Sequence, residues 1–380
     1  MKKILLTAIA LLTLASASVF GMYGVDGDDW ISFLTDGNQF RARMDQLGFV
    51  LGNDTIKGTF GVRADTGYMG SIINNGGTYN DESVSLNPTI SAGIGYTSSA
   101  FSIGVGYNFT YIDRFLQVHT PVLMLNALDN SLQFVAPIQV AITDTDKYRA
   151  SGAPAWIPET KMKFTGVGFN NMELRYATGI DAFNEIRVYA SYFNASTETS
   201  VNKTIQEALG LELRLYFLKT TVGNVGINPF IKVQYSTALK GYNTAEFMVS
   251  DYRFGGGILD TQKQSDIFDV SPYEVVIAPT LALEASSDIV SLYFEPSLGY
   301  SMSSYKPRRF TEVTTHSLYW GAYAEMYVTP VQDLEWYFEM DVNGDVTGAA
   351  DSKANQNLSP VYFETTTGIT WYLPSFGAAE

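Results

Sequence analysis

The stretch ISAGIGYTSSAFSIGVGYNFTY, residues 90–111, decides the fold of this chain. Apolar residues stand at every second position from 90 to 96, and the alternation resumes from 101 to 111 after Ser98-Ser99. The positions between them hold Ser, Gly, Asn and Thr. Because successive side chains of a strand point to opposite faces, the stretch predicts a β-hairpin with one apolar and one polar face.

The same period of two runs through the chain after residue 28. Sixteen segments carry it, near residues 29–35, 38–51, 55–65, 87–97, 100–112, 131–143, 159–168, 171–178, 184–194, 207–218, 226–238, 272–285, 288–301, 315–328, 332–343 and 360–372. Several exceed the roughly five or six residues usual in soluble sheets, and they suit the ~9–11 that cross a bilayer at a tilt.

The connections between these segments alternate in length in the second half of the chain. Outer-membrane barrels have short periplasmic turns, longer outer loops, an even strand number and both termini inside. On that rule the predicted outer loops are 66–86, 113–130, 239–271, 302–314 and 344–359. An even number then requires a strand before residue 38, which 29–35 supplies through the turn Asp36-Gly37. Connection 144–158 is an exception, because it is long on the predicted inner side.

The composition excludes several classes of protein. The 380 residues are 46% hydrophobic, 14% aromatic and 17% charged, with a net charge of -15 and no cysteine. Disordered chains have low hydrophobicity and few aromatics, and nucleic-acid binding needs a basic surface, so both are excluded. The absence of cysteine excludes a disulfide scaffold, a thiolate metal site and a lipid anchor on an N-terminal cysteine.

The N-terminus has the pattern of a secretory signal. Lys2 and Lys3 precede an uncharged apolar run at 4–14 and a stretch of mostly small residues at 15–21. The run is shorter than the ~18 or more apolar residues of a membrane helix. We therefore predict a signal peptide at 1–21, cleaved after Gly21 or alternatively after Ala17, and a single barrel domain at 22–380.

The polar face of the strands distinguishes a membrane barrel from a soluble sandwich, whose solvent face would be rich in Lys and Glu. Here many strands carry Gly, Ser, Thr and Asn on that face. The aromatic residues expected at a membrane interface lie near strand ends, namely Tyr111, Tyr300, Tyr319, Trp320, Trp336, Trp371 and Tyr372. Backbone groups in lipid must all be paired, so such a sheet closes. We predict an all-β fold, a transmembrane antiparallel β-barrel of the outer-membrane type with about 16 strands (range 14–18). A soluble periplasmic β-protein is the alternative.

The segment MYGVDGDDWISFLTDGNQFRARMDQLGFVLGNDTIKGTFGVRAD, residues 22–65, resembles the start of the variable surface proteins of Brachyspira, a spirochaete genus formerly called Serpulina. The resemblance implies an abundant, surface-exposed outer-membrane antigen encoded by several related gene copies, with a role in antigenic variation. It transfers no catalytic residue.

No motif predicts an active site, a cofactor or a metal, so the chain is predicted not to be an enzyme. His119 and His316 lie in or beside predicted outer loops without a catalytic arrangement around them. The pairs Gly93-x-Gly95, Gly104-x-Gly106 and Gly166-x-Gly168 lie inside strands, where they make room for bulky neighbours or allow curvature. The cluster at 341–345 lacks the spacing of a calcium loop and is interpreted as a turn.

Charges on the polar face fall into two groups that a closed barrel brings together at its seam. The early strands carry Arg41, Arg43, Lys57 and Arg63, and the late strands carry Glu274, Glu295, Glu325, Glu335, Glu339, Asp341 and Glu364. One interpretation is ion pairs that hold the wall together. The other is a transverse field in a pore that favours small cations, because carboxylate rings select for cations.

The predicted function is therefore a variable surface antigen of the outer membrane, with a host-interaction and immune-evasion role. The alternatives are a general diffusion porin, cation-preferring on the second interpretation of the charges, and an adhesin. Predicted partners are outer-membrane lipid, a second copy of the chain, and host molecules or antibodies that bind the loops, but not nucleic acid.

Overall fold

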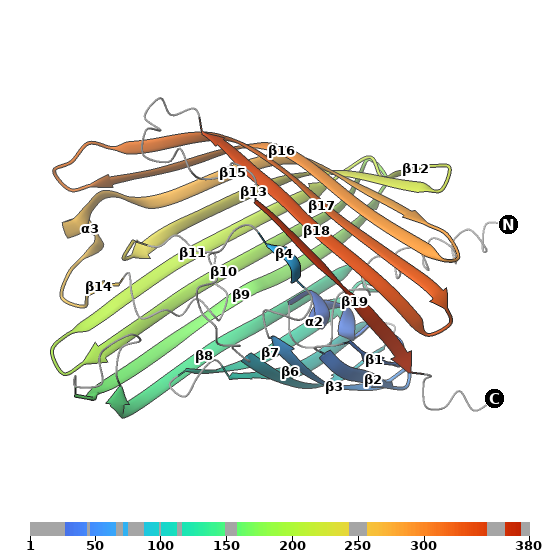
Figure 1. Cartoon of the computed structure of the whole chain (residues 1–380), viewed down its shortest axis with the longest axis horizontal. Helices are drawn as coiled ribbons and strands as arrows, with labels where there is room; N and C mark the ends of the chain where they lie inside the picture. Colours follow the sequence, from blue (N-terminus) through green and yellow to red (C-terminus); the bar gives the residue numbers. More distant parts are fainter. Residues whose placement is uncertain are drawn as a thin grey trace.

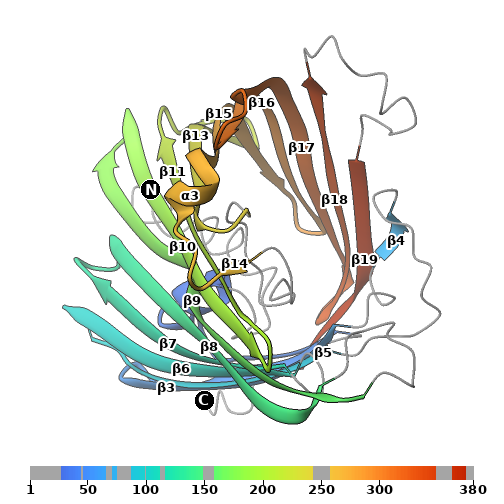
Figure 2. The same ribbon diagram turned by 90° about the vertical axis from the view of Figure 1, so that its left-hand side faces the viewer.

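The computed structural model describes residues 27–43, 46–65, 71–74, 87–98, 100–111, 116–148, 158–242, 257–347 and 362–373. Sixteen antiparallel strands form a closed wall (Figures 1 and 2). In order around the ring they are β1 Gln39–Ala42, β2 Gln46–Gly52, β3 Ile56–Asp65, β5 Asn87–Tyr96, β6 Phe101–Tyr111, β7 Gln117–Ala127, β8 Leu132–Tyr148, β9 Thr160–Ile180, β10 Phe183–Thr199, β11 Lys203–Tyr216, β13 Val225–Lys240, β15 Phe268–Ser286, β16 Val290–Pro307, β17 Val313–Val331, β18 Leu334–Thr347 and β19 Tyr362–Leu373.

Shorter elements supplement this wall. Strand β4 (Ser71–Asn74) pairs with β19, β12 (Thr220–Val222) with β13, and β14 (Ile258–Leu259) with β11. Two helices, α2 (Gly27–Phe33) and α3 (Gln264–Ile267), complete the described residues.

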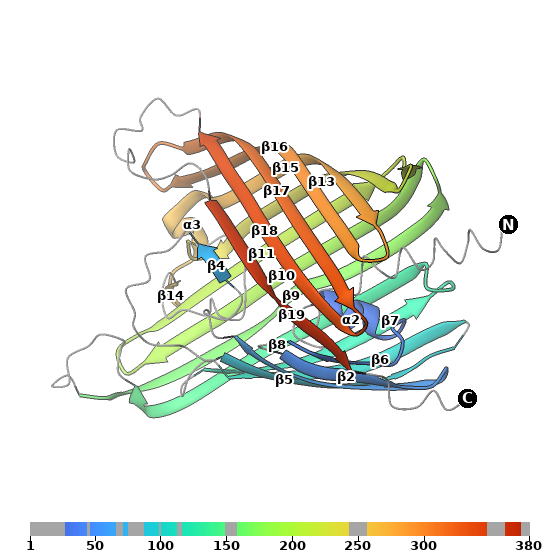
Figure 3. The same ribbon diagram turned by 45° about the vertical axis from the view of Figure 1, so that its right-hand side comes forward.

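The wall closes where the short strand β1 joins the last strand. Arg41 pairs with Tyr372 and Ala42 with Trp371, while β1 also pairs with β2. Figure 3 shows β19 running down to the blue strands that begin the wall. Closure leaves no open sheet edge in lipid, as a membrane-spanning sheet requires. The predicted fold class and the predicted strand number are confirmed.

Because neighbouring strands run in opposite directions, successive connections lie at alternate ends of the barrel. The short-turn end holds connections 53–55, 97–100, 128–131, 181–182, 217–224, 287–289 and 332–333, together with the start of β1 and the end of β19. The long-connection end holds 43–45, 66–86, 112–116, 149–159, 200–202, 241–267, 308–312 and 348–361. All of the longest connections therefore lie at one end, as in outer-membrane barrels.

The strand predicted at 29–35 is wrong, because these residues belong to α2 and the turn that follows it. Trp30, Phe33 and Leu34 have the i, i+3, i+4 spacing of a helix face, and all are buried. Asp28 and Asp29 in the first turn complement the partial positive charge of a helix N-terminus.

The outer loop predicted at 113–130 is also wrong, because most of it is strand β7. Its alternation is hidden in the sequence, since Val118, Val122 and Met124 make the buried face apolar as well. The additional strand resolves the exception at 144–158. With β7 in place, connection 149–159 falls at the long-connection end.

Three other predicted strands have wrong boundaries, and one predicted turn is part of a strand. Segment 38–51 is two strands, β1 and β2, and the sequence between them has neither glycine nor proline. Segments 159–168 and 171–178 are one strand, β9, with a register shift at Asn171, whose φ is +50°. The turn interpreted at 341–345 is extended backbone of β18, paired with β17. Two of these corrections remove a strand and two add one. The predicted number of sixteen strands therefore agrees with the number in the wall.

The outward face of the wall is apolar over most of its surface. On the hairpin that opened the sequence analysis, Ile94 is 57% exposed and Val105 is 53% exposed, whereas Ser91 and Ser102 face inward and are buried. Leu298, Trp336 and Trp371 are likewise exposed. This is the surface that a barrel presents to lipid. Among the residues described, no helix is long and apolar enough to span a membrane.

Candidate functional site

The lumen contains α2, which lies inside the ring of strands and packs on the wall (Figure 2). Its side chains Trp30, Ile31, Phe33 and Leu34 form one buried cluster with wall residues of β2, β7 and β8. A seven-residue helix has little stability alone, so this packing holds it in place.

Glycines of β5 and β6 make the room for α2. A Cβ at Gly93 would lie 2.6 Å from the Trp30 ring, and one at Gly106 would lie 2.5 Å from it. A Cβ at Gly95 would lie 2.5 Å from the Leu34 side chain. These pairs therefore form sockets for bulky side chains, which is one of the two roles inferred for them from the sequence.

Lys57 fixes the end of α2. From β3, its Nζ donates to the carbonyl oxygen of Leu34 at 3.0 Å and to that of Asp36 at 2.5 Å. Carbonyl groups at a helix C-terminus lack helical partners and favour a cation. Lys57, predicted as a lumen charge, thus binds the helix instead of facing an open lumen.

Four basic residues form a cross-strand row on the neighbouring part of the wall. Arg175 of β9 pairs in register with Arg187 of β10, Arg187 with Arg214 of β11, and Arg214 with Lys232 of β13. We name these four residues the basic ladder. Like charges directly opposite one another destabilise a sheet, so the ladder needs compensation.

Each arginine of the ladder receives that compensation from a glutamate two residues earlier on its own strand. Arg187 donates to Glu185 through Nε at 2.8 Å and Nη2 at 3.1 Å. Arg175 makes the same two-pronged contact with Glu173, and Arg214 bonds Glu212. Tyrosine rings add cation–π contacts, with the Arg187 guanidinium 4.9 Å from the Tyr216 ring and that of Arg214 4.8 Å from the Tyr189 ring.

The next four wall strands carry carboxylates instead. We name Glu284 of β15, Glu295 of β16, Glu325 of β17, and Glu339 and Asp341 of β18 the acidic wall. Glu325 and Glu339 pair directly across β17 and β18. Tyrosines alternate with the carboxylates, since Tyr293 pairs with Glu284 and Glu325, and Tyr323 pairs with Glu295 and Asp341. The Tyr293 hydroxyl donates to Glu295.

A third group of polar residues spans the line of closure. Tyr372 donates to Glu335 at 3.1 Å, and Arg43 Nε donates to Thr370 at 2.9 Å. The Arg43 guanidinium lies 4.2 Å from the Tyr337 ring, and Arg41 is buried opposite Tyr372. These contacts tie β1 to β18 and β19.

The predicted lumen charges thus divide between several places. Arg41, Arg43 and Glu335 meet at the closure, while Glu295, Glu325, Glu339 and Asp341 belong to the acidic wall. Arg63 lies on β3 between Gln46 and Thr89 in register. Glu274 lies on β15 toward the long-connection end, roughly 30 Å along the strand from Glu284 at ~3.3 Å per residue. The backbone of Glu364 pairs in register with Asp341, and its side chain is not among those that the structure describes.

The sequence prediction missed the basic ladder. A usable signal was present, because the triplets Glu173-Leu-Arg175, Glu185-Ile-Arg187 and Glu212-Leu-Arg214 repeat one spacing on consecutive strands. Two predicted interface aromatics were also misassigned. Tyr372 faces inward to Glu335, and Tyr319 faces inward with its ring 5.4 Å from Lys232 Nζ.

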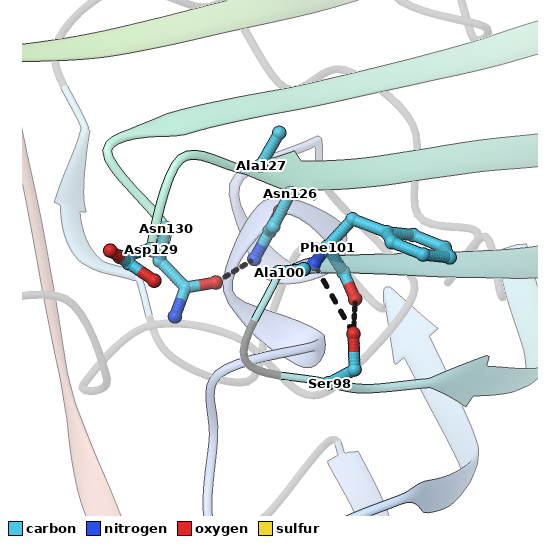
Figure 4. A pocket seen from close by; sticks show the side chains of 7 residues that line it. All are labelled: Ser98, Ala100, Phe101, Asn126, Ala127, Asp129 and Asn130. Atoms are coloured by element: carbon cyan, nitrogen blue, oxygen red, sulfur yellow. Dashed lines mark hydrogen bonds between the residues drawn. The ribbon is translucent and has the colours of Figure 1, made fainter.

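A small cleft of about 150 Å³ lies between two turns of the short-turn end (Figure 4). Ser98 bonds the backbone of Phe101, and Asn126 donates to Asn130 at 3.2 Å. These bonds are ordinary turn contacts. Within the described ranges, no group of His, Cys, Asp and Glu is arranged to hold a metal ion.

A closed antiparallel barrel with an apolar exterior and a charged lumen defines the class as an outer-membrane β-barrel protein. Within that class, the chain belongs to the Serpulina hyodysenteriae variable surface protein family, which it matches over residues 2–372. The resemblance predicted from residues 22–65 is confirmed. Family and fold together support an outer-membrane location.

Other comparisons gave distant similarities. No curated protein matches the chain. Among solved structures, it is similar to OmpT, an outer membrane protein of Vibrio cholerae, with 9% identity, a TM-score of 0.35 and coverage of 89% of this chain and 97% of that one. It is also similar to the FrpB iron transporter of Neisseria meningitidis, with 9% identity, a TM-score of 0.35 and coverage of 92% and 83%.

Proposed function

We propose that the protein is a surface-exposed antigen of the outer membrane, exported by the signal peptide at 1–21, with its long-connection end facing outward. Membership of a variable surface protein family and the separation of connections by length carry this proposal. Connections can vary in sequence because few packed contacts constrain them, whereas the wall strands must keep their pairing. The proposed function is non-enzymatic.

Labelling of intact cells tests the orientation, and the absence of native cysteine makes the experiment clean. Phe310→Cys lies in connection 308–312 and is 72% exposed, while Asp288→Cys lies in a short turn at the other end. A membrane-impermeant maleimide should label the first variant in intact cells and the second only after permeabilisation. Labelling of the Asp288→Cys variant alone in intact cells would refute the orientation.

Immune evasion requires variation in the exposed parts. Related gene copies should differ most in residues 66–86, 149–159, 241–267 and 348–361, and least in the wall strands. Differences spread evenly over wall and connections would contradict this role. Antibodies and host molecules are the proposed partners of the same surface, and an adhesive role would use it in the same way.

A diffusion pore is the second proposed function, and the charges of the lumen favour it. The arginines of the basic ladder are neutralised by their own glutamates, whereas the acidic wall presents carboxylates among tyrosines. Such a lumen favours cations. In planar bilayers the folded protein should give conductance steps with a cation preference, which Glu325→Gln with Glu339→Gln should reduce and the turn variant Asp333→Asn should not. Absence of steps from folded protein would exclude the pore.

A further inference from the structure

The two histidines of the chain share one environment, although neither lies in the lumen. His119 of β7 and His316 of β17 are both exposed on the outward face. The hydroxyl of Tyr107 lies 2.5 Å from Nδ1 of His119, and the hydroxyl of Tyr300 lies 2.5 Å from Nδ1 of His316. The ring of Phe109 packs 5.3 Å from the imidazole of His119.

The two Tyr–His pairs are built in the same way on opposite sides of the barrel. In each pair the tyrosine lies on the preceding strand, in register with the residue two positions beyond the histidine, which is Pro121 in one case and Leu318 in the other. Strands β8, β9, β10, β11, β13 and β15 separate the pairs in one direction. Strands β18, β19, β1, β2, β3 and β5 separate them in the other.

Both pairs lie near the end of the apolar exterior, which on β8 extends one outward residue further, to Ile142. Beyond His119, toward the short-turn end, the outward residues of β7 are Pro121, Leu123 and Leu125, whereas Gln117 lies on the other side. From His316 to Val328, β17 advances roughly 30 Å along the barrel axis at ~3.4 Å per residue and a ~40° tilt. The apolar band of such barrels is about 25 Å tall. The histidines are therefore at the level of the lipid headgroups, at the long-connection end.

The chemistry of the pairs then selects a ligand. When the tyrosine hydroxyl donates to Nδ1, the proton of the neutral imidazole is on Nε2, which becomes a donor. Nε2 has no hydrogen-bond partner among the described residues. The acceptors available at this level are headgroup oxygens, and phosphate oxygens are the strongest of them. We propose that each Tyr–His pair binds the phosphate of one lipid headgroup, so that two lipids are held on opposite sides of the barrel.

Native mass spectrometry of the full, folded chain tests this inference. The protein in detergent is mixed with phosphatidylglycerol, and retained lipids are counted. His119→Phe with His316→Phe keeps an aromatic ring at each position and removes Nε2. We expect the wild type to retain two more phosphatidylglycerol molecules than this double variant, and each single variant to lose one. The matched control, Leu123→Phe with Met326→Phe, alters outward residues of the same two strands away from both Tyr–His pairs and should retain the wild-type number.

Diacylglycerol with the same acyl chains, which lacks the phosphate, should show no difference between wild type and double variant. A heat-dependent shift in gel mobility verifies that each variant is folded. Equal retention of phosphatidylglycerol by wild type and double variant would overturn the proposal, as would an equal loss of diacylglycerol. The inference depends on the barrel and its lipid-facing surface, so it stands or falls independently of the proposed surface antigen and of the pore.

Discussion

Inside the barrel, the wall from β5 to β8 faces α2 with glycines and apolar side chains, whereas the wall from β9 to β18 carries the basic ladder and the acidic wall. The outward faces of both regions are alike, because both meet lipid. The inward faces differ because one region has a helix to pack against, whereas the other carries charges and tyrosines beside apolar clusters that the wall strands form among themselves. The residue type required at an inward position of the wall therefore depends on what that position faces inside the barrel. The facing residues lie far away in sequence.

The largest loss of stability should come from truncating Trp30, the side chain that packs α2 on the wall. Trp30 is 1% exposed, so Trp30→Ala should lower the free energy of unfolding by about 3–5 kcal/mol through lost burial and a residual cavity. Urea unfolding in detergent micelles measures it. Trp336→Ala on the lipid face is the control, and it should cost less. Equal costs would mean that α2 does not brace the wall.

A smaller loss of stability is expected when a side chain is added at Gly106, which makes room for the Trp30 ring. Gly106→Val places a side chain in the space of the Trp30 ring and should cost about 1–3 kcal/mol by overpacking. In the Trp30→Ala background the cost should shrink, which gives a coupling of about 0.5–3 kcal/mol in a double-mutant cycle. Gly58→Val is the matched control, since its Cβ meets nothing closer than 3.9 Å. Additive effects would exclude the socket.

Loss of the helix-end contact should cost less again. Lys57→Met removes two hydrogen bonds to carbonyl groups at the end of α2, and about 1–2 kcal/mol of stability should go with them. The exposed Lys219→Met, which makes the same change in charge, should leave the urea midpoint unchanged. If both variants shift it equally, net charge and not the contact is the cause.

The smallest changes in stability should come from the charged residues, with opposite signs in the acidic wall and in the basic ladder. Glu325→Gln relieves the like-charge pair with Glu339 and should stabilise the protein by about 0.2–1 kcal/mol. Glu212→Gln weakens the pair with Arg214 and should destabilise it by a similar amount. Urea midpoints at constant m-value measure both. Destabilisation by both substitutions would show that the acidic wall is compensated as fully as the ladder.

The success of the sequence prediction differs between the same two regions of the wall. Alternation identified most of the wall strands, because the outward face is apolar everywhere and the inward face of those strands is polar or glycine. It failed at β7, whose inward Val118, Val122 and Met124 lie in apolar clusters inside the barrel. It also failed at residues 30–34, which were assigned to a strand to make the strand number even, although Trp30, Phe33 and Leu34 have helical spacing.

The charged site was predictable only in part. Residues of the acidic wall and of the closure, such as Glu325 and Arg43, were selected as polar-face charges on adjacent strands. The basic ladder was not, because its arginines become neighbours only through the registers of β9, β10, β11 and β13. Lys57 was assigned to the lumen, but its role depends on a helix that the sequence analysis did not predict.

The central claim is that the apolar side of the alternation faces lipid and the other side faces a lumen that contains α2. Two single-tryptophan proteins test it most directly, one retaining Trp336 and the other Trp30, with the remaining tryptophans replaced by Phe. In vesicles of brominated phospholipid, the fluorescence of Trp336 should be strongly quenched and that of Trp30 should be nearly unaffected, since Trp336 is exposed outside and Trp30 is buried inside. Quenching of Trp30 to the same extent as Trp336, or of neither, would contradict the account.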